Sequence, residues 1–204
     1  MKKIMLVDDH QMIKLGLKTF IEENSDFCVS KMTSTVPETL DYLENCQKQN
    51  ETLPDAIIFD IQLEEEMSFD LIKTVSQNFP EIKSVVYSMF DSTGFQLLAK
   101  DCGAVAYVSK TSSGKNLIDA LEKVFNGEEF FESESREKLT KLAQVTLVLT
   151  NKEKQIFEYI LMGKNNLEIT KLMKVKLNTV EKYISSIYEK LGVRYREEIL
   201  EKYK

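Results

Sequence analysis

This sequence of 204 residues lacks both a long apolar run and a cysteine pattern typical of metal binding. No apolar stretch approaches the roughly 18 residues of a membrane span, and the first residues lead into a strand-like run instead of a signal-peptide core. The cysteines Cys28, Cys46 and Cys102 form no CxxC pair, and His10 is the single histidine. We therefore expect a cytoplasmic protein without a membrane partner, in which the cysteines are unpaired and His10 begins a helix.

Charge is distributed unevenly along the chain. Residues 1–146 carry 15 Lys and Arg against 25 Asp and Glu, a net charge of −10, whereas residues 147–204 carry 12 against 8, a net charge of +4. An acidic segment repels nucleic acid, while a modestly basic one attracts it. The two parts of the chain are therefore predicted to have different partners.

Strand and helix signals alternate through the first 126 residues. Apolar runs lie at 4–7, 27–32, 55–60, 83–88 and 104–109, and amphipathic segments lie at 11–23, 37–47, 68–78, 92–101 and 114–125. This pattern predicts an α/β fold with a doubly wound, five-stranded parallel sheet. The segment Thr35-Val36-Pro37-Glu38 further predicts a capping box at the start of the second helix.

Charged side chains follow three of these apolar runs. Asp8 and Asp9 follow the first, Asp60 the third and Lys110 the fifth. Because the carboxyl ends of parallel strands meet at one edge of the sheet, we expect these side chains to converge. Close carboxylates repel one another unless a cation lies among them, and Mg²⁺ is the hard divalent ion that this predicts. An adjacent lysine suits phosphoryl transfer, which makes Asp60 the expected acceptor.

With Ser88 after the fourth run, these residues resemble the receiver domain of bacterial two-component response regulators over about residues 1–126. The resemblance implies that Asp60 accepts a phosphoryl group from a histidine kinase. It also implies that Ser88 and Lys110 contact the phosphoryl oxygens, and that Tyr107 is an aromatic switch. Taken singly, Ser88 could instead cap a turn, and Tyr107 could simply pack in the core.

The same resemblance implies that Mg²⁺ is bound by Asp9, Asp60 and the backbone carbonyl of Gln62, with Asp8 nearby. The loop after Asp60 departs from the family pattern, because it carries glutamates at 64–66 and lacks the usual proline. These glutamates are either a solvated loop or a means of tuning metal affinity and kinase choice.

An enzymatic function is not expected. A phosphatase of the haloacid dehalogenase type would place a second aspartate two positions after Asp60 as its general acid, but Gln62 stands there and an amide cannot donate that proton. No GxxxxGK[ST] segment occurs in the chain either, which argues against a P-loop enzyme.

Residues 127–148 are predicted to be a charge-rich linker with a short helical pattern through Leu139, Leu142 and Ala143. The last part, residues 149–204, predicts a small all-α domain. Thr150 can cap its first helix, a second helix is expected at about 167–173, and a third from Thr179 to Leu191.

The segments Asn178-Thr179-Val180-Glu181-Lys182-Tyr183 and Glu189-Lys190-Leu191-Gly192-Val193 carry a resemblance to the LuxR-type, or NarL-type, helix-turn-helix, over about residues 149–204. The resemblance implies a four-helix domain whose last long helix enters the major groove of DNA. The expected DNA contacts are Lys164, Lys176, Asn178, Thr179, Glu181, Lys182, Ser185, Ser186 and Lys190, with Lys174, Arg194 and Arg196 as further phosphate contacts.

These observations predict a DNA-binding response regulator that is phosphorylated on Asp60 and regulates transcription. Double-stranded DNA, a histidine kinase and Mg²⁺ are the expected partners, with RNA polymerase as a further candidate. Because a surplus of +4 is small for DNA binding, we expect a homodimer in the phosphorylated protein. The alternative is a phosphorylation-switched adaptor whose C-terminal helices bind a protein.

Overall fold

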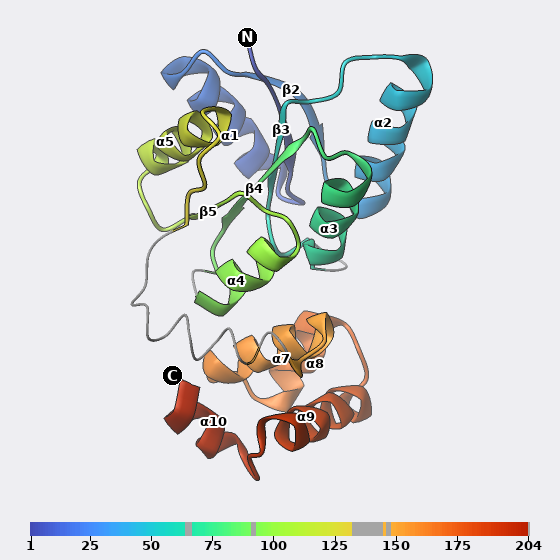
Figure 1. The fold of residues 1–204 in the computed structure, drawn as a ribbon, viewed down its shortest axis with the longest axis vertical. Helices are drawn as coiled ribbons and strands as arrows, with labels where there is room; N and C mark the ends of the chain where they lie inside the picture. Colours follow the sequence, from blue (N-terminus) through green and yellow to red (C-terminus); the bar gives the residue numbers. More distant parts are fainter. Residues whose placement is uncertain (64–66, 91–92, 132–144, 146–147, 204) are drawn as a thin grey trace. The chain divides into compact units, whose positions relative to one another are not determined.

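The computed structural model describes residues 1–63, 67–90, 93–131, 145 and 148–203, which form two compact units (Figure 1). The glutamates at 64–66 and the predicted helical pattern at 139–143 lie outside the described residues. None of the helices in the described ranges has the length and hydropathy that a membrane span requires.

The N-terminal unit is built on a five-stranded parallel sheet with strand order β2-β1-β3-β4-β5. Its strands are β1 (Lys3–Val7), β2 (Cys28–Thr33), β3 (Ala56–Phe59), β4 (Lys83–Ser88) and β5 (Ala106–Ser109). The helices that alternate with them are α1 (Gln11–Asn24), α2 (Val36–Gln49), α3 (Phe69–Asn78), α4 (Thr93–Asp101) and α5 (Gly114–Phe125). The predicted doubly wound α/β sheet is therefore confirmed.

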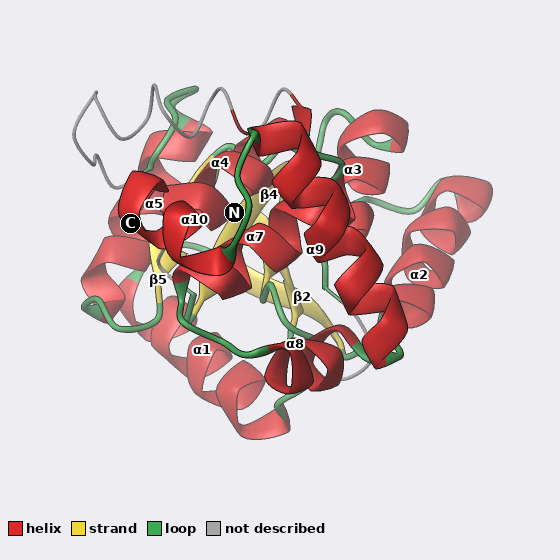
Figure 2. Ribbon diagram, turned by 90° about the horizontal axis from the view of Figure 1, so that it is seen from below, coloured by secondary structure: helices red, strands yellow, loops and turns green. Residues whose placement is uncertain are grey.

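Both faces of this sheet are covered, so the central strands are almost continuously apolar. Figure 2 shows α1 and α5 on one side of the sheet and α2 and α3 on the other. Ile4 and Leu6 of β1 and Ile58 of β3 pack with Leu117 and Leu121 of α5 in one buried cluster. This packing holds the strands in register, so that all five end at the same edge.

The predicted capping box of α2 forms only in part. The Thr35 hydroxyl accepts a hydrogen bond from Glu38 N at 3.3 Å, as expected. The Glu38 carboxylate, however, accepts from Ser34 N at 2.8 Å instead of from Thr35 N. The glutamate therefore caps the residue before the N-cap, and the reciprocal part of the prediction is wrong.

The first residues of the predicted linker pair with the outer edge of β5. Tyr107 N donates to Phe130 O at 2.7 Å, and Phe130 N donates to Val105 O at 3.1 Å. The Phe130 side chain packs against the core cluster between the sheet and α5. This pairing covers part of an edge strand that would otherwise present unpaired backbone groups.

The C-terminal unit consists of α7 (Asn151–Leu161), α8 (Asn166–Met173), α9 (Leu177–Leu191) and α10 (Arg196–Tyr203). Within it, α7 and α8 pack on α9, and α10 packs on α7. Ile169, Val180, Ile187 and Ile199 are fully buried. Capping boxes at Thr150 and Asn165 begin α7 and α8, and only the first of these caps was predicted.

Two glycines with positive φ provide a matched stability test. Gly103 has φ of +98°, and a Cβ placed there would lie 2.1 Å from Ser76 Oγ. Gly127 has φ of +85° in open space. We expect Gly103→Ala to lower the free energy of unfolding by about 2–4 kcal/mol, because overpacking adds to backbone strain. For Gly127→Ala we expect a loss of about 1 kcal/mol from strain alone.

Urea denaturation of the full-length variants, followed by hydrogen exchange of the β4 and β5 amides, measures the two losses. Equal losses in the two variants would show that the contact with Ser76 contributes nothing.

Candidate functional site

Side chains from the ends of β1, β3, β4 and β5 converge at one edge of the sheet. Lys110 Nζ, which follows β5, lies 2.8 Å from Asp8 Oδ2 and 2.6 Å from Asp60 Oδ2. All three side chains are at least nine-tenths buried. The expected convergence of carboxylates around one ammonium is therefore seen, and it joins residues that are up to 102 positions apart.

A hollow of about 380 Å³ opens beside these groups. Its lining includes Asp9, Asp60, Gln62, Ser88, Phe90 and Lys110. The candidate acceptor carboxylate is thus reachable by a small group, although the rest of its side chain is buried.

The electrostatics of the site are set by burial and by the lysine. Burial raises the pKa of Asp60 and outweighs the lowering effect of the adjacent Lys110 ammonium. Burial lowers the pKa of Lys110, but Asp60 and Asp8 outweigh it, and the net shift is upward. Lys110 therefore stays charged, while the carboxylate form of Asp60 would gain from an additional cation.

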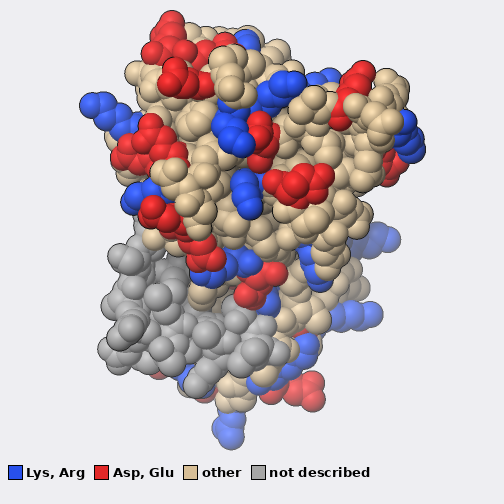
Figure 3. All heavy atoms as spheres, turned by 45° about the horizontal axis from the view of Figure 1, so that its top comes forward, with Lys and Arg blue, Asp and Glu red and all other residues tan. Residues whose placement is uncertain are grey.

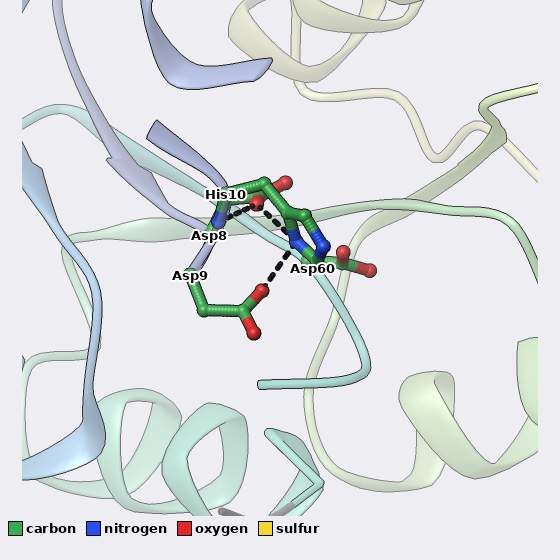
Figure 4. Close-up of side chains that lie close together, drawn as sticks. All are labelled: Asp8, Asp9, His10 and Asp60. Carbon is green, nitrogen blue, oxygen red and sulfur yellow. Dashed lines mark hydrogen bonds and ion pairs between the residues drawn. The ribbon is translucent and has the colours of Figure 1, made fainter. Parts of the chain in front are cut away.

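The donor set fits a divalent cation. Asp8, Asp9, His10 and Asp60 each offer one ligand atom, and these atoms all lie within 4.8 Å of one another (Figure 4). Within the described part of the chain, the solvent-shielded Asp9 Oδ1 forms no hydrogen bond of regular geometry, although His10 Nδ1 lies 2.6 Å from it. A buried carboxylate oxygen without a well-aligned donor is costly, and a bound cation would satisfy it.

His10 lies at the start of α1, as predicted, and its ring also contacts the carboxylate cluster. The residue is the N-cap of α1, as expected, and its side chain caps no backbone group of the helix. Its ring nitrogen Nδ1 lies 2.6 Å from Asp9 Oδ1 and 3.4 Å from Asp8 Oδ1. Because the chain has no second histidine and no cysteine near position 10, the sequence does not indicate this contact.

Phe90 links the two candidate switch residues, a role that residue spacing alone does not indicate. Phe90 N donates a hydrogen bond to Ser88 Oγ at 3.3 Å. The hydroxyl of the buried Tyr107 donates to the Phe90 carbonyl oxygen. Ser88 therefore caps a turn, and Tyr107 points inward, in the structure described here.

The exposed side of α9 carries most of the predicted DNA contacts. A shallow depression of about 580 Å³ runs along it. The depression is lined by Asn178, Glu181, Lys182, Ser185, Ser186 and Glu189. The buried side of the same helix holds Val180, Ile184 and Ile187, so the helix is amphipathic as predicted.

Some of the predicted DNA contacts make bonds inside the helical unit. Glu153, which is buried, accepts hydrogen bonds from Ser186 Oγ at 2.6 Å and from Lys190 Nζ at 2.6 Å. Burial alone would raise the pKa of Glu153, but bonds from Lys190, Ser186 and Thr150 outweigh it and lower the pKa to about 2. Arg196 likewise donates to the side chain of Asn166 at 2.7 Å.

Comparison with known proteins agrees with this architecture. Residues 4–122 match the response regulator receiver domain, and residues 147–202 match the luxR family of bacterial regulatory proteins. The chain belongs to the response regulator family. Response regulator protein VraR of Staphylococcus aureus is 30% identical over 198 residues, which cover 95% of this response regulator and 92% of VraR. The match to the luxR family favours DNA binding over the adaptor alternative.

Solved structures share the fold. RcsB from Salmonella enterica serovar Typhimurium, bound to a promoter in the presence of the phosphomimetic BeF3−, aligns with a TM-score of 0.65 at 19% identity. That alignment covers 100% of this response regulator and 98% of RcsB. A LuxR-family response regulator from Aurantimonas sp. SI85-9A1 aligns with a TM-score of 0.56 at 23% identity, over 71% of this chain and 97% of that one.

The Glu153 contacts generate a pH-dependent prediction. The pKa of Glu153 lies below its usual value of 4.5 in the folded domain, at about 2. Its stabilisation is therefore present in full above about pH 4.5 and is lost as the pH falls toward 2. We expect Glu153→Gln to destabilise the helical domain by about 2–3 kcal/mol at neutral pH and to flatten its acid dependence.

Glu168→Gln is the matched control, because Glu168 completes a capping box on the surface, at Asn165. We expect this control to lose at most about 1 kcal/mol. Hydrogen exchange of the α7 and α9 amides in the full-length protein, measured between pH 7 and pH 3, provides the comparison. Equal effects of the two variants would contradict a role for the Lys190 and Ser186 contacts.

Proposed function

We propose that Asp60 of this response regulator accepts a phosphoryl group from a phosphohistidine of a histidine kinase, and that the reaction takes place in the cytoplasm. The observation that carries the proposal is the position of Lys110 between Asp8 and Asp60, beside a hollow that reaches the Asp60 carboxylate. Asp9, Asp60 and the backbone carbonyl of Gln62 would hold Mg²⁺, with Asp8 beside it.

The reaction is a displacement at phosphorus. An Asp60 carboxylate oxygen bonds to the phosphorus atom, the nitrogen–phosphorus bond breaks, and its electron pair returns to the kinase imidazole. Mg²⁺ held by those residues would supply positive charge to the phosphoryl oxygens. Lys110 Nζ is already 2.6 Å from Asp60, so a small rotation brings the ammonium to a phosphoryl oxygen and stabilises the acyl phosphate.

The contacts of Phe90 suggest how phosphorylation is sensed. Ser88 Oγ accepts from Phe90 N, while Tyr107 donates to the carbonyl of the same residue. If the Ser88 hydroxyl rotates to donate a hydrogen bond to a phosphoryl oxygen, the turn from Ser88 to Phe90 loses the hydrogen bond from Phe90 N to Ser88 Oγ. The Tyr107 ring is then released from its partner, which gives the expected aromatic switch a structural cause.

We further propose that the outer face of α9 reads double-stranded DNA. Acidic patches mark the visible surface of the receiver domain (Figure 3), whereas residues 147–204 have a net charge of +4. Lys190 and Arg196 already make bonds inside the domain. The predicted phosphate contacts that remain are Lys164, Lys174, Lys176, Lys182 and Arg194. Two copies would double that number, which supports a homodimer on DNA, with RNA polymerase as a candidate partner.

Asp60→Asn tests the acceptor. Acetyl phosphate and Mg²⁺ should add one phosphoryl group to the wild-type protein, as seen by intact-mass spectrometry, and should leave Asp60→Asn unlabelled. Asp41→Asn on the exposed surface of α2 is the matched control and should label like the wild type. Labelling of Asp60→Asn at the wild-type level would refute the assignment.

Lys182→Ala tests the DNA-binding face. Lys182 is exposed on α9, and removing one phosphate contact should lower the slope of log K against log salt by about 1 per protomer. Lys48→Ala makes the same charge change on exposed α2 and should leave the slope unchanged. Fluorescence anisotropy with a random-sequence duplex measures both slopes, and identical slopes would argue against α9 as the contact surface.

A further inference from the structure

The imidazole of His10 lies beside the carboxylate cluster, and 64% of its side chain is exposed. Its backbone is fixed, since His10 N donates to Asp8 Oδ1 at 2.7 Å. Its Nδ1 lies 2.6 Å from Asp9 Oδ1, and the potential ligand atoms of His10 and Asp60 lie within 4.8 Å of each other (Figure 4). The ring also lines the hollow above the site. His10 therefore faces the space that a bound cation would occupy.

Charge balance leaves Asp9 as the acid that needs a further partner. Three carboxylates and the Lys110 ammonium leave an excess of two negative charges, which a divalent cation would neutralise. Lys110 pairs with Asp8 and Asp60, whereas within the described residues Asp9 pairs with His10. With its proton on Nε2, a neutral imidazole presents a lone pair at Nδ1 and adds no charge. It can therefore join the cation as a ligand, with metal coordination replacing the direct contact between Nδ1 and Asp9 Oδ1.

The distances suit a shared coordination sphere. Adjacent ligands of a six-coordinate ion with bonds of about 2.1 Å are about 3 Å apart. The separations of His10 Nδ1 from Asp9 Oδ1 and Asp8 Oδ1 are 2.6 Å and 3.4 Å, on either side of that value. Oxygen ligands alone suit Mg²⁺, whereas an imidazole nitrogen favours first-row transition metals.

We propose that His10 Nδ1 is a ligand of the divalent cation, and that it shifts the preference of the site from Mg²⁺ toward ions such as Mn²⁺ and Co²⁺. This inference rests on the proposed metal-assisted function and specifies which metals that site takes. The carboxylates of Asp8, Asp9 and Asp60 provide the negative charge that binds a divalent cation. The imidazole nitrogen of His10 favours borderline ions over hard ions.

The single histidine of the chain permits a direct test. Full-length protein without a histidine tag is loaded with Mn²⁺, and pulsed electron paramagnetic resonance is used to detect nitrogen-14 bound to the ion. We expect imidazole modulation in the wild type and its loss in His10→Ala. Absence of that modulation in the wild type would overturn the proposal, whether or not the variant folds.

Selectivity is measured on the same samples by displacing Mn²⁺ with Co²⁺ or with Mg²⁺. The ratio of Co²⁺ to Mg²⁺ affinity should fall about tenfold or more in His10→Ala and His10→Gln. A ratio that stays constant in both variants would contradict a ligand role. These measurements need no phosphoryl donor, so failure of Asp60 to accept a phosphoryl group would be seen separately, in the labelling experiment.

Discussion

The ion pairs of Lys110 are the interaction on which the site depends. Asp8 and Asp60 are nearly buried, and two adjacent carboxylates at the edge of a sheet would repel each other without a cation. Lys110 follows β5, which is separated from β1 by β3 and β4 in the sheet. Its ammonium nevertheless lies within 2.8 Å of both carboxylates. Because burial also raises the pKa of Asp60, a further positive charge at the site would stabilise the carboxylate form of Asp60.

The fold of the N-terminal domain could largely be predicted, because each strand and helix is encoded by a short local pattern of apolar and polar residues. Each strand is an apolar run, and the parallel arrangement sends polar residues that follow these runs to one edge. Asp8, Asp60 and Lys110 could therefore be grouped from the sequence. The contact of the His10 ring with Asp9 could not, because it depends on a side-chain rotation at the start of α1 that no spacing encodes.

In the helical domain, the polar side of α9 alone does not predict which of its side chains are free to contact DNA. Ser186 and Lys190 fall on the polar side of α9, and that position alone predicts contact with DNA. Their bonds to Glu153 depend on how α7 crosses α9, which is a tertiary feature. A buried carboxylate must be neutralised, so Ser186 and Lys190 stabilise the packing of α7 on α9, and Lys182 remains as an exposed cation on α9.

The role of Asp60 as acceptor can be measured by the binding of a phosphoryl mimic. Fluorine NMR of the full-length protein with beryllium fluoride reports whether BeF3− binds at the Asp60 carboxylate, and it needs no kinase. We expect bound fluorine resonances that require a divalent cation and that disappear in Asp60→Asn. Bound resonances that persist in Asp60→Asn, or the absence of any in the wild type with Mg²⁺, would contradict it.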